Sequence, residues 1–507
     1  MVAAGILTSR LSGLVRSSVV AHFLGNGPIA SAWTAAFRIP NLLQNLFGEG
    51  ALSASFIPVY ARLEAEGDRD AAQRLAGAVA TLLALLVATL VAVGMLATPL
   101  LIDLIAPGFE GEMRELTIRL VRIAFPGTGI LVLSAWCLGV LNSHRRFFLP
   151  YAAPVAWNAA IIAAFLLAGS PDDLPRLAEL AMWGAVAGSA LQLLVQLPTV
   201  LALLGRLRIS LRRTEPLGTV LRNFLPVSLS RGVTQVSAYV DVLMATLISA
   251  TAVASLGYAQ LLSTLPVSLF GMSVSAAELP AMSSARGTET EVATELRRRL
   301  DAGLGRIAYF VVPSAVAFMA IGHLLAAIVF QSGRFTAEDS VTVWSILAAS
   351  AVGLLAATFG RLYSSSFYAL RDTRTPVRYA IARVVLGIGL GWFLGLRVPP
   401  LLGIDARWAT AGLALGASLA AWVEFMLLRQ GMNRRIGATG IAGASLARLG
   451  AAALVAAAGA WLAHLALPGL GRLQGIVAAG VFGVLYLTTT YALGVPEARG
   501  LIRRSVR

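Results

Sequence analysis

Residues 75–102 read LAGAVATLLALLVATLVAVGMLATPLLI, and no charged side chain stands between Arg74 and Asp103. A helix that crosses a bilayer needs about 20 apolar residues in a row, so this stretch predicts a membrane span. The rest of the chain is similar: 57% of its 507 residues are hydrophobic, 13% are charged, and the mean hydropathy is +0.78. Because about a quarter of the residues of a soluble protein are charged, this composition excludes an ordinary soluble protein.

Apolar stretches bounded by polar turns recur along the whole chain and predict about 14 spans. We therefore expect an all-α polytopic membrane protein. The predicted spans are centred near residues 12, 38, 88, 130, 160, 190, 235, 265, 315, 350, 387, 417, 457 and 483.

The net charge of +15 is a topology signal. All 40 basic residues are arginines, and sorting the predicted loops alternately puts 26 on the side of the C-terminus and seven on the other. By the positive-inside rule both termini are expected in the cytoplasm, in a bacterial cytoplasmic membrane. The arginines are spread over short segments, so no nucleic-acid partner is expected. Arg10 and Arg16 interrupt the first apolar stretch, so no cleavable signal peptide is expected either.

Two parts of the chain match each other at a nearly constant spacing of about 221 to 225 residues. The matching segments are 9–10 with 230–231, 46–48 with 269–271, 107–109 with 332–334, and the turn at Arg146 with Arg371.

This repeat predicts the domain organisation. Six predicted helices separate the copies, so both copies run in the same direction through the membrane. We expect two pseudo-symmetric six-helix lobes, residues 1–210 and 211–436, that face each other across a cavity. Residues 437–507 add two C-terminal helices outside the repeat and a cytoplasmic end.

Charged and polar side chains at membrane depth are the candidate substrate-binding residues, because an arginine at mid-bilayer costs at least about 2.5 kcal/mol. A guanidinium matches phosphate with two hydrogen bonds, so these residues predict a chamber for a phosphorylated substrate. They are Arg10, Arg16, Arg38 and Arg231, with the polar run Asn41, Gln44, Asn45 and Glu49.

Other polar residues of the spans leave alternatives open. Asp241 could be a cation site or a salt-bridge partner, and Tyr258 and Gln260 face the chamber only if their helix mirrors the second one. Arg122, Arg361 and Arg383 could instead extend to the membrane interface. Glu49 and Glu278 could be structural counter-ions, and Glu424 is as likely to cap a packing contact as to bind a ligand.

The sequence does not predict an enzyme. Its four histidines lack metal-ligand spacing, and no nucleotide-binding loop or nucleophile elbow is found. No cofactor or metal is expected, so energy would have to come from the membrane potential or from a monovalent cation gradient.

Several motifs resemble those of the MurJ (MviN) lipid II flippases, over nearly the whole chain. They are residues 9–16 (SRLSGLVR), 37–43 (FRIPNLL), 47–58 (FGEGALSASFIP), 106–109 (APGF), 331–336 (QSGRFT) and 367–377 (FYALRDTRTPV).

The resemblance implies the fold of the MOP exporter superfamily and alternating access. It implies that lipid II, a peptidoglycan precursor on undecaprenyl diphosphate, moves from the inner to the outer leaflet. Arg10 and Arg16 would bind the diphosphate or sugar headgroup, Glu49 would be functional, and the last two helices would form a groove for the polyprenyl tail. Membrane lipids and the cell-wall synthesis machinery are the further partners that it implies.

The chain also departs from that family. The family commonly has an acid where Ser17 and Ser31 stand, an arginine at Gln44, and an arginine and a glutamate at Leu261 and Thr264. The alternatives are therefore a flippase for another polyprenyl-diphosphate glycan, an exporter of amphipathic drugs, or a non-transporting scaffold of an envelope-synthesis complex. A chamber rich in arginine favours anionic cargo over cationic drugs. A membrane glycosyltransferase is disfavoured because the acidic loops are sparse.

Overall fold

The computed structural model describes the chain except for residues 1, 170–171, 206–213, 285–287, 470 and 506–507. The described residues form helices and no strand, which confirms the expected all-α class. They pack into two compact units. Unit 1 comprises Met1–Ala254 and Ser332–Phe335, and unit 2 comprises Ser255–Gln331 and Thr336–Arg507.

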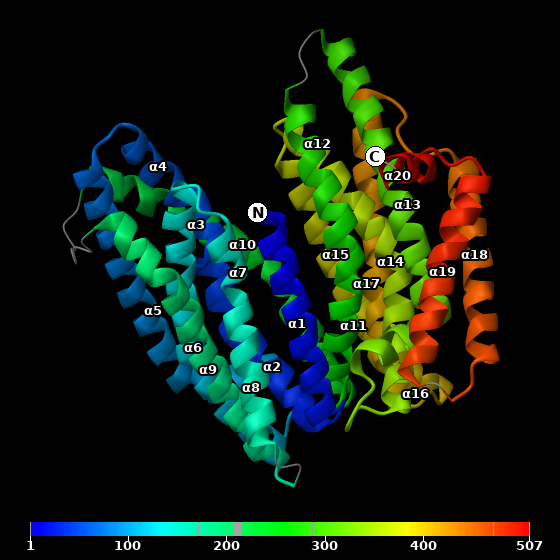
Figure 1. The fold of residues 1–507 in the computed structure, drawn as a ribbon, viewed down its shortest axis with the longest axis horizontal. Helices are drawn as coiled ribbons and strands as arrows, with labels where there is room; N and C mark the ends of the chain where they lie inside the picture. The colour runs from blue at the N-terminus through cyan, green and yellow to red at the C-terminus, as the bar shows by residue number, and fades with distance from the viewer. Residues whose placement is uncertain (1, 170–171, 206–213, 285–287, 470, 506–507) are drawn as a thin grey trace. The chain divides into compact units, whose positions relative to one another are not determined.

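Unit 1 is built around α6, which is largely buried among its neighbours (Figure 1). Its helices are α1 (Val2–Leu24), α2 (Pro28–Phe47), α3 (Glu49–Ser55), α4 (Ile57–Ala65), α5 (Arg69–Ile105), α6 (Gly111–Ser143), α7 (Phe148–Ala152), α8 (Pro154–Ala168), α9 (Leu174–Leu204) and α10 (Glu215–Ile248).

Unit 2 is built around α13 and α14, which pack against each other and against the remaining long helices. Its helices are α11 (Ala252–Pro266), η1 (Val267–Met272), α12 (Ser273–Ser283), α13 (Glu289–Phe330), α14 (Ala337–Ala369), α15 (Arg374–Trp392), η2 (Phe393–Arg397), α16 (Val398–Leu402), α17 (Ala406–Ile436), α18 (Gly443–Ala466), α19 (Arg472–Ala492) and α20 (Pro496–Ser505).

Within the described residues, 11 helical runs are long and apolar enough to cross a membrane. The long helices α1, α2 and α10 fall outside that set, because polar and charged residues interrupt their apolar stretches. Each of the predicted span centres nevertheless lies inside a helix.

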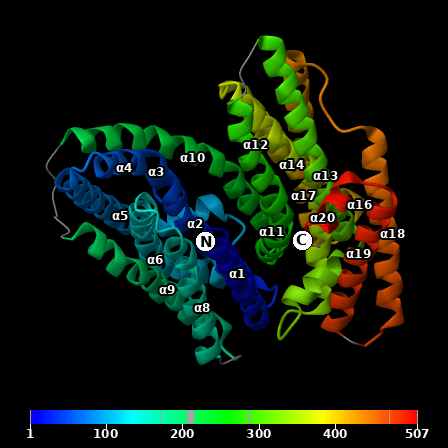
Figure 2. The ribbon, with the colours of Figure 1, turned by 45° about the horizontal axis from the view of Figure 1, so that its top comes forward.

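The predicted lobe boundary at residue 210 falls outside the described residues. The two packing units divide between Ala254 and Ser255, apart from Ser332–Phe335, which packs with unit 1; the predicted lobes stay a prediction. The units divide there because α10 runs across α2, α3, α4 and α5 and therefore belongs to unit 1 (Figure 2).

Matching turns support the internal repeat. α6 and α14 each end just before an arginine in the left-handed region, with φ of 58° at Arg145 and 59° at Arg371. In both turns the next N–H donates to the carbonyl five residues back, that of Leu141 or of Phe367, at 2.8 and 2.9 Å. This is the Schellman arrangement, and it occurs at corresponding places in the two copies.

Prolines inside the long helices free carbonyl groups that neighbouring side chains then bind. Pro99 lacks the N–H that would bond to Met95 four residues earlier, and Arg122 of α6 donates to that carbonyl at 3.2 Å. In α13, Pro313 likewise frees the carbonyl of Tyr309, which accepts from the Tyr486 hydroxyl at 2.6 Å. Arg122 thus has a structural partner in unit 1.

α13 is also kinked at Ile321, where φ is −125° and ψ is 19°. Two indole N–H groups bind carbonyls beside this kink. Trp344 of α14 donates to Met319, and Trp461 of α18 donates to Ala320, both at 3.0 Å. Because lipid supplies no hydrogen bonds to the backbone, these contacts stabilise the bent helix.

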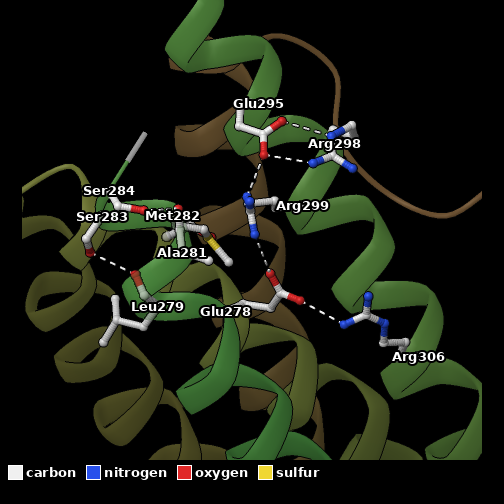
Figure 3. A network of polar contacts seen from close by, with 11 residues as sticks. Glu278, Leu279, Ala281, Met282, Ser283, Ser284, Glu295, Arg298, Arg299 and Arg306 are labelled. Atoms are coloured by element: carbon white, nitrogen blue, oxygen red, sulfur yellow. Dashed lines mark hydrogen bonds and ion pairs between the residues drawn. The ribbon is translucent and has the colours of Figure 1, made fainter. Parts of the chain in front are cut away.

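An ion-pair network joins α12 to α13 (Figure 3). Glu278, which is buried, contacts Arg306 at 2.8 Å and Arg299 at 3.7 Å. Glu295 pairs with Arg298 at 2.8 Å and with Arg299 at 2.6 Å. Glu278 is thus a structural counter-ion, one of the alternatives that the sequence leaves open.

Candidate functional site

A cavity of about 930 Å³ lies within unit 1. The walls follow helical spacing, since most helices contribute residues three and four positions apart and therefore on one face. The lining residues are Ile6, Ser9 and Arg10 of α1; Asn41, Gln44 and Asn45 of α2; Glu49, Gly50, Ser53 and Ala54 of α3; Leu131, Ser134, Ala135 and Leu138 of α6; Pro150, Tyr151 and Pro154 of α7 and α8; and Gln192 and Gln196 of α9.

The wall formed by α1, α2 and α3 carries the charged groups of the lining, Arg10 and Glu49. The helix is interrupted between α2 and α3 at Gly48, whose N–H donates to the carbonyl of Gln44 at 2.8 Å. A Cβ on Gly48 would lie 2.3 Å from that oxygen, so only glycine fits there. The break turns Glu49 into the first residue of α3, on the cavity wall.

The wall formed by α6 and α9 is uncharged, and its polar side chains are Ser134, Gln192 and Gln196. The Gln196 amide nitrogen Nε2 donates to Ser134 Oγ at 2.6 Å, and that of Gln192 donates to the same oxygen at 3.2 Å. Gln196 is only 1% exposed, and its Oε1 accepts no hydrogen bond from the described protein groups. The sequence did not predict this cluster, because the predicted site was confined to spans that also carry charged residues. Two glutamines four residues apart in an apolar span, Gln192 and Gln196, were the available signal.

Arg16 does not line this cavity, although it shares α1 with Arg10. Its Nη1 donates to Asn158 Oδ1 at 3.2 Å, and its guanidinium lies 4.9 Å from the ring centroid of Trp157. Six residues of α-helix turn by about 240°, so Arg16 points to α8. In this structure it joins α1 to α8, and its predicted contact with substrate stays a prediction.

Arg38 and Asp241 also lie outside the lining. The backbone carbonyl of Arg38 accepts from the Tyr239 hydroxyl at 2.9 Å. Asp241 lies on the same helix as Tyr239, and both alternatives for it, a cation site and a salt-bridge partner, stay predictions. Arg231 lies in α10, but its side chain is outside the described part of the chain.

The remaining candidates belong to unit 2, whereas the cavity lies in unit 1. Tyr258 is buried, with its ring centroid 4.9 Å from that of Phe330. Gln260 is half-buried on the same helix. Tyr258 and Gln260 therefore remain predictions. Arg383 pairs with Glu424 at 3.3 Å, so Glu424 serves as a counter-ion.

The cavity brings together five of the candidate substrate-binding residues: Arg10, Asn41, Gln44, Asn45 and Glu49. Its charged and amide side chains can bind phosphate oxygens and hydroxyl or amide groups. Among the residues that the structure describes, no cluster of three or more His, Cys, Asp or Glu side chains could hold a metal ion.

Sequence comparisons match this chain to one family. The family model described as lipid II flippase MurJ matches residues 20–474. The lipid II flippase MurJ of Burkholderia cenocepacia is 31% identical over 436 residues, which cover 85% of this chain and 82% of the relative. The probable lipid II flippase MurJ of Rhizobium meliloti is 31% identical over 431 residues, covering 83% and 77%.

Solved structures show the same fold. A lipid II flippase MurJ in an inward closed conformation superposes with a TM-score of 0.80 at 22% identity, covering 99% of each chain. An inward-facing MATE family multidrug transporter of the MOP superfamily gives a TM-score of 0.65 at 18% identity, covering 84% of this chain and 95% of its own.

Proposed function

Because this chain belongs to the lipid II flippase MurJ family, we propose that it carries lipid II from the inner to the outer leaflet of the bacterial cytoplasmic membrane. It is a multi-pass membrane transporter and not an enzyme. Translocation proceeds by alternating access, in which two conformations that bind the cargo differently exchange populations.

The observation that carries this proposal is the cavity of unit 1. Its volume of about 930 Å³ is at the upper end of small-molecule sites, which span roughly 300 to 1,000 Å³. Arg10 stands on its wall, and a guanidinium can hold a diphosphate through two parallel hydrogen bonds. The amides of Asn41 and Gln44 add neutral hydrogen-bonding groups beside it.

The polyprenyl tail needs an apolar path outside this polar cavity. We assign it to α18 and α19, which expose many large apolar side chains, among them Leu454, Leu462, Leu473 and Val484. The energy source is the membrane potential or a monovalent cation, since one charge crossing 100 mV supplies about 2.3 kcal/mol. Both termini are cytoplasmic, and membrane lipids and the cell-wall synthesis machinery are the further partners.

The departures from the family pattern favour a second cargo. Gln44 lines the cavity at a position where the family tends to have arginine, so this wall has one fewer positive charge for phosphate. Ser31, in contrast, is fully buried, and its hydroxyl accepts from the Ala254 N–H at 3.0 Å, so that change is structural. Another polyprenyl-diphosphate glycan, which shares the diphosphate and differs in the headgroup that the cavity would contact, is the second candidate cargo.

Reconstitution in liposomes tests both cargoes. The purified chain is placed in vesicles with fluorescent lipid II, and transfer between leaflets is followed by the fraction that an impermeant quencher reaches. We expect transfer with the wild-type chain and background rates with Arg10→Ala. A second set of vesicles carries undecaprenyl-diphosphate-linked glycans other than lipid II. Transfer of these alone would replace lipid II as cargo, and transfer of neither lipid would overturn the proposal.

A further inference from the structure

The cavity of unit 1 has two chemically different walls. Arg10 and Glu49, on α1 and α3, are its charged lining residues, whereas α6 and α9 contribute only neutral ones. Phosphate groups need cations, so the first wall suits a diphosphate. The second wall offers amides and a hydroxyl, which bind groups that both donate and accept hydrogen bonds.

The neutral wall is a built cluster. Two amide nitrogens, those of Gln192 and Gln196, donate to the single Ser134 oxygen, and Gln196 Nε2 also donates to the carbonyl of Gln192 at 3.0 Å. Ser134 and Gln196 are 2% and 1% exposed, so both are held between α6 and α9. Because the Ser134 oxygen accepts twice, its proton remains available to a further acceptor.

One atom of this cluster is left without a partner. Gln196 Oε1 is buried and accepts no hydrogen bond among the described groups. A buried acceptor without a donor costs free energy. If the cluster served only to join α6 to α9, it would gain nothing from an unsatisfied Gln196 Oε1. A ligand that brings an N–H or O–H group would satisfy it.

We propose that Ser134, Gln192 and Gln196 form a subsite for neutral amide or hydroxyl groups of the cargo headgroup, while Arg10 holds its phosphates. The inference rests on the proposed function and deepens it, because it assigns the glycan end of the cargo to the α6–α9 wall. The subsite then lets the protein distinguish a diphosphate lipid that carries a glycan from one that carries none.

Binding to two lipids tests the subsite. The full chain in nanodiscs is titrated with lipid II and with undecaprenyl diphosphate, which lacks the glycan. We expect wild type to prefer lipid II by about tenfold or more, the value of one to two net hydrogen bonds. The double variant Gln192→Leu/Gln196→Leu should bind undecaprenyl diphosphate like wild type and lose that preference. Arg10→Ala should weaken the binding of both lipids and keep the preference for lipid II.

Controls separate the possible failures. Gln430→Leu makes the same change on an exposed part of α17 and should leave both affinities unchanged. If the double variant unfolds, the preference for lipid II is measured with the single variant Gln192→Leu, at a half-buried residue, and its thermal unfolding is checked in parallel. A variant that folds and keeps the preference overturns the subsite while leaving the flippase proposal intact. A wild-type chain that binds neither lipid overturns the flippase proposal as well.

Discussion

Arg10 and Arg16 show how two arginines of one helix can take different roles. Arg10 lines the cavity, whereas Arg16 lies against Trp157 and Asn158 of α8. The Arg16–Asn158 contact continues to Ser12, which accepts from Asn158 Nδ2 at 2.8 Å. If the cavity binds cargo as proposed, Arg10 would touch it, whereas in this structure Arg16 joins α1 to α8.

Arg10→Ala should abolish transport without lowering the amount of protein in the membrane. Arg10→Lys should restore transport only in part, because a lysine keeps the charge and loses the planar fork that holds phosphate with two bonds. Flipping rates and membrane levels are measured together. Arg62→Ala, at an exposed surface ion pair, is the control and should be silent. Membrane levels that fall in parallel with transport would make Arg10 a structural residue.

Arg16→Lys should act through stability instead. Its contacts with Trp157 and Asn158 are worth about 1 kcal/mol together, so thermal unfolding in detergent should begin at a lower temperature, and Asn158→Ala should resemble it. Cargo affinity measured below the unfolding range should stay near the wild-type value. A loss of affinity at unchanged stability would instead support the predicted role of Arg16 in substrate binding.

The part of the site on α1, α2 and α3 could be predicted from sequence, and the part on α6 and α9 could not. Arg10 and Glu49 stand out because charges are costly at membrane depth. Arg16 stands out equally, since cost alone does not say which face of α1 meets the cavity. Ser134, Gln192 and Gln196 escaped notice because uncharged polar residues are tolerated in membrane helices, and their significance depends on α6 and α9 being neighbours.

At the scale of the helix, prolines and kinks leave backbone carbonyls that side chains of neighbouring helices must bind. α13 has a carbonyl freed by Pro313 and a bend at Ile321, and side chains from α14, α18 and α19 bind the carbonyls there. α18 and α19 thus stabilise the bent α13 through these hydrogen bonds, in addition to any role with the lipid tail.

Tyr486→Phe should lower stability by about 1 kcal/mol, because it leaves the buried Tyr309 carbonyl without a donor. Pro313→Ala restores an N–H that can bond to the same carbonyl. In the Pro313→Ala background, Tyr486→Phe should therefore be nearly neutral. The free energies of unfolding of the four proteins give the double-mutant cycle. Additive effects of the two substitutions would contradict stabilisation of α13 by the bond from Tyr486 to the Tyr309 carbonyl.

The sequence predicts the existence of the helices better than their irregularities. Every expected span centre lies in a helix, because long apolar runs have no other stable structure in lipid. The interruption at Gly48, the π-helix Val267–Met272 and the kink at Ile321 were not predicted. The last two lie at contacts with residues distant in sequence, such as that between Gly271 and Thr358, which the local sequence does not reveal.

At the scale of the whole molecule, the distribution of arginines predicts a topology that cysteine labelling can test. The single native cysteine, Cys137, is buried, so the wild-type chain should not react with an impermeant maleimide. Both Glu66 and Glu110 are exposed on turns at opposite ends of α5. In intact cells Glu110→Cys should be labelled and Glu66→Cys should be protected, and the reverse pattern would invert the proposed orientation.

The central claim is that the cavity around Arg10 moves lipid II across the membrane. The most direct measurement is complementation of a bacterium depleted of its own lipid II flippase, scoring growth and the lipid II exposed on the outer leaflet. Wild type should restore both, and an equally abundant Arg10→Ala variant should restore neither. Rescue by Arg10→Ala at the wild-type level, or no rescue by a well-inserted wild-type chain, would contradict the account.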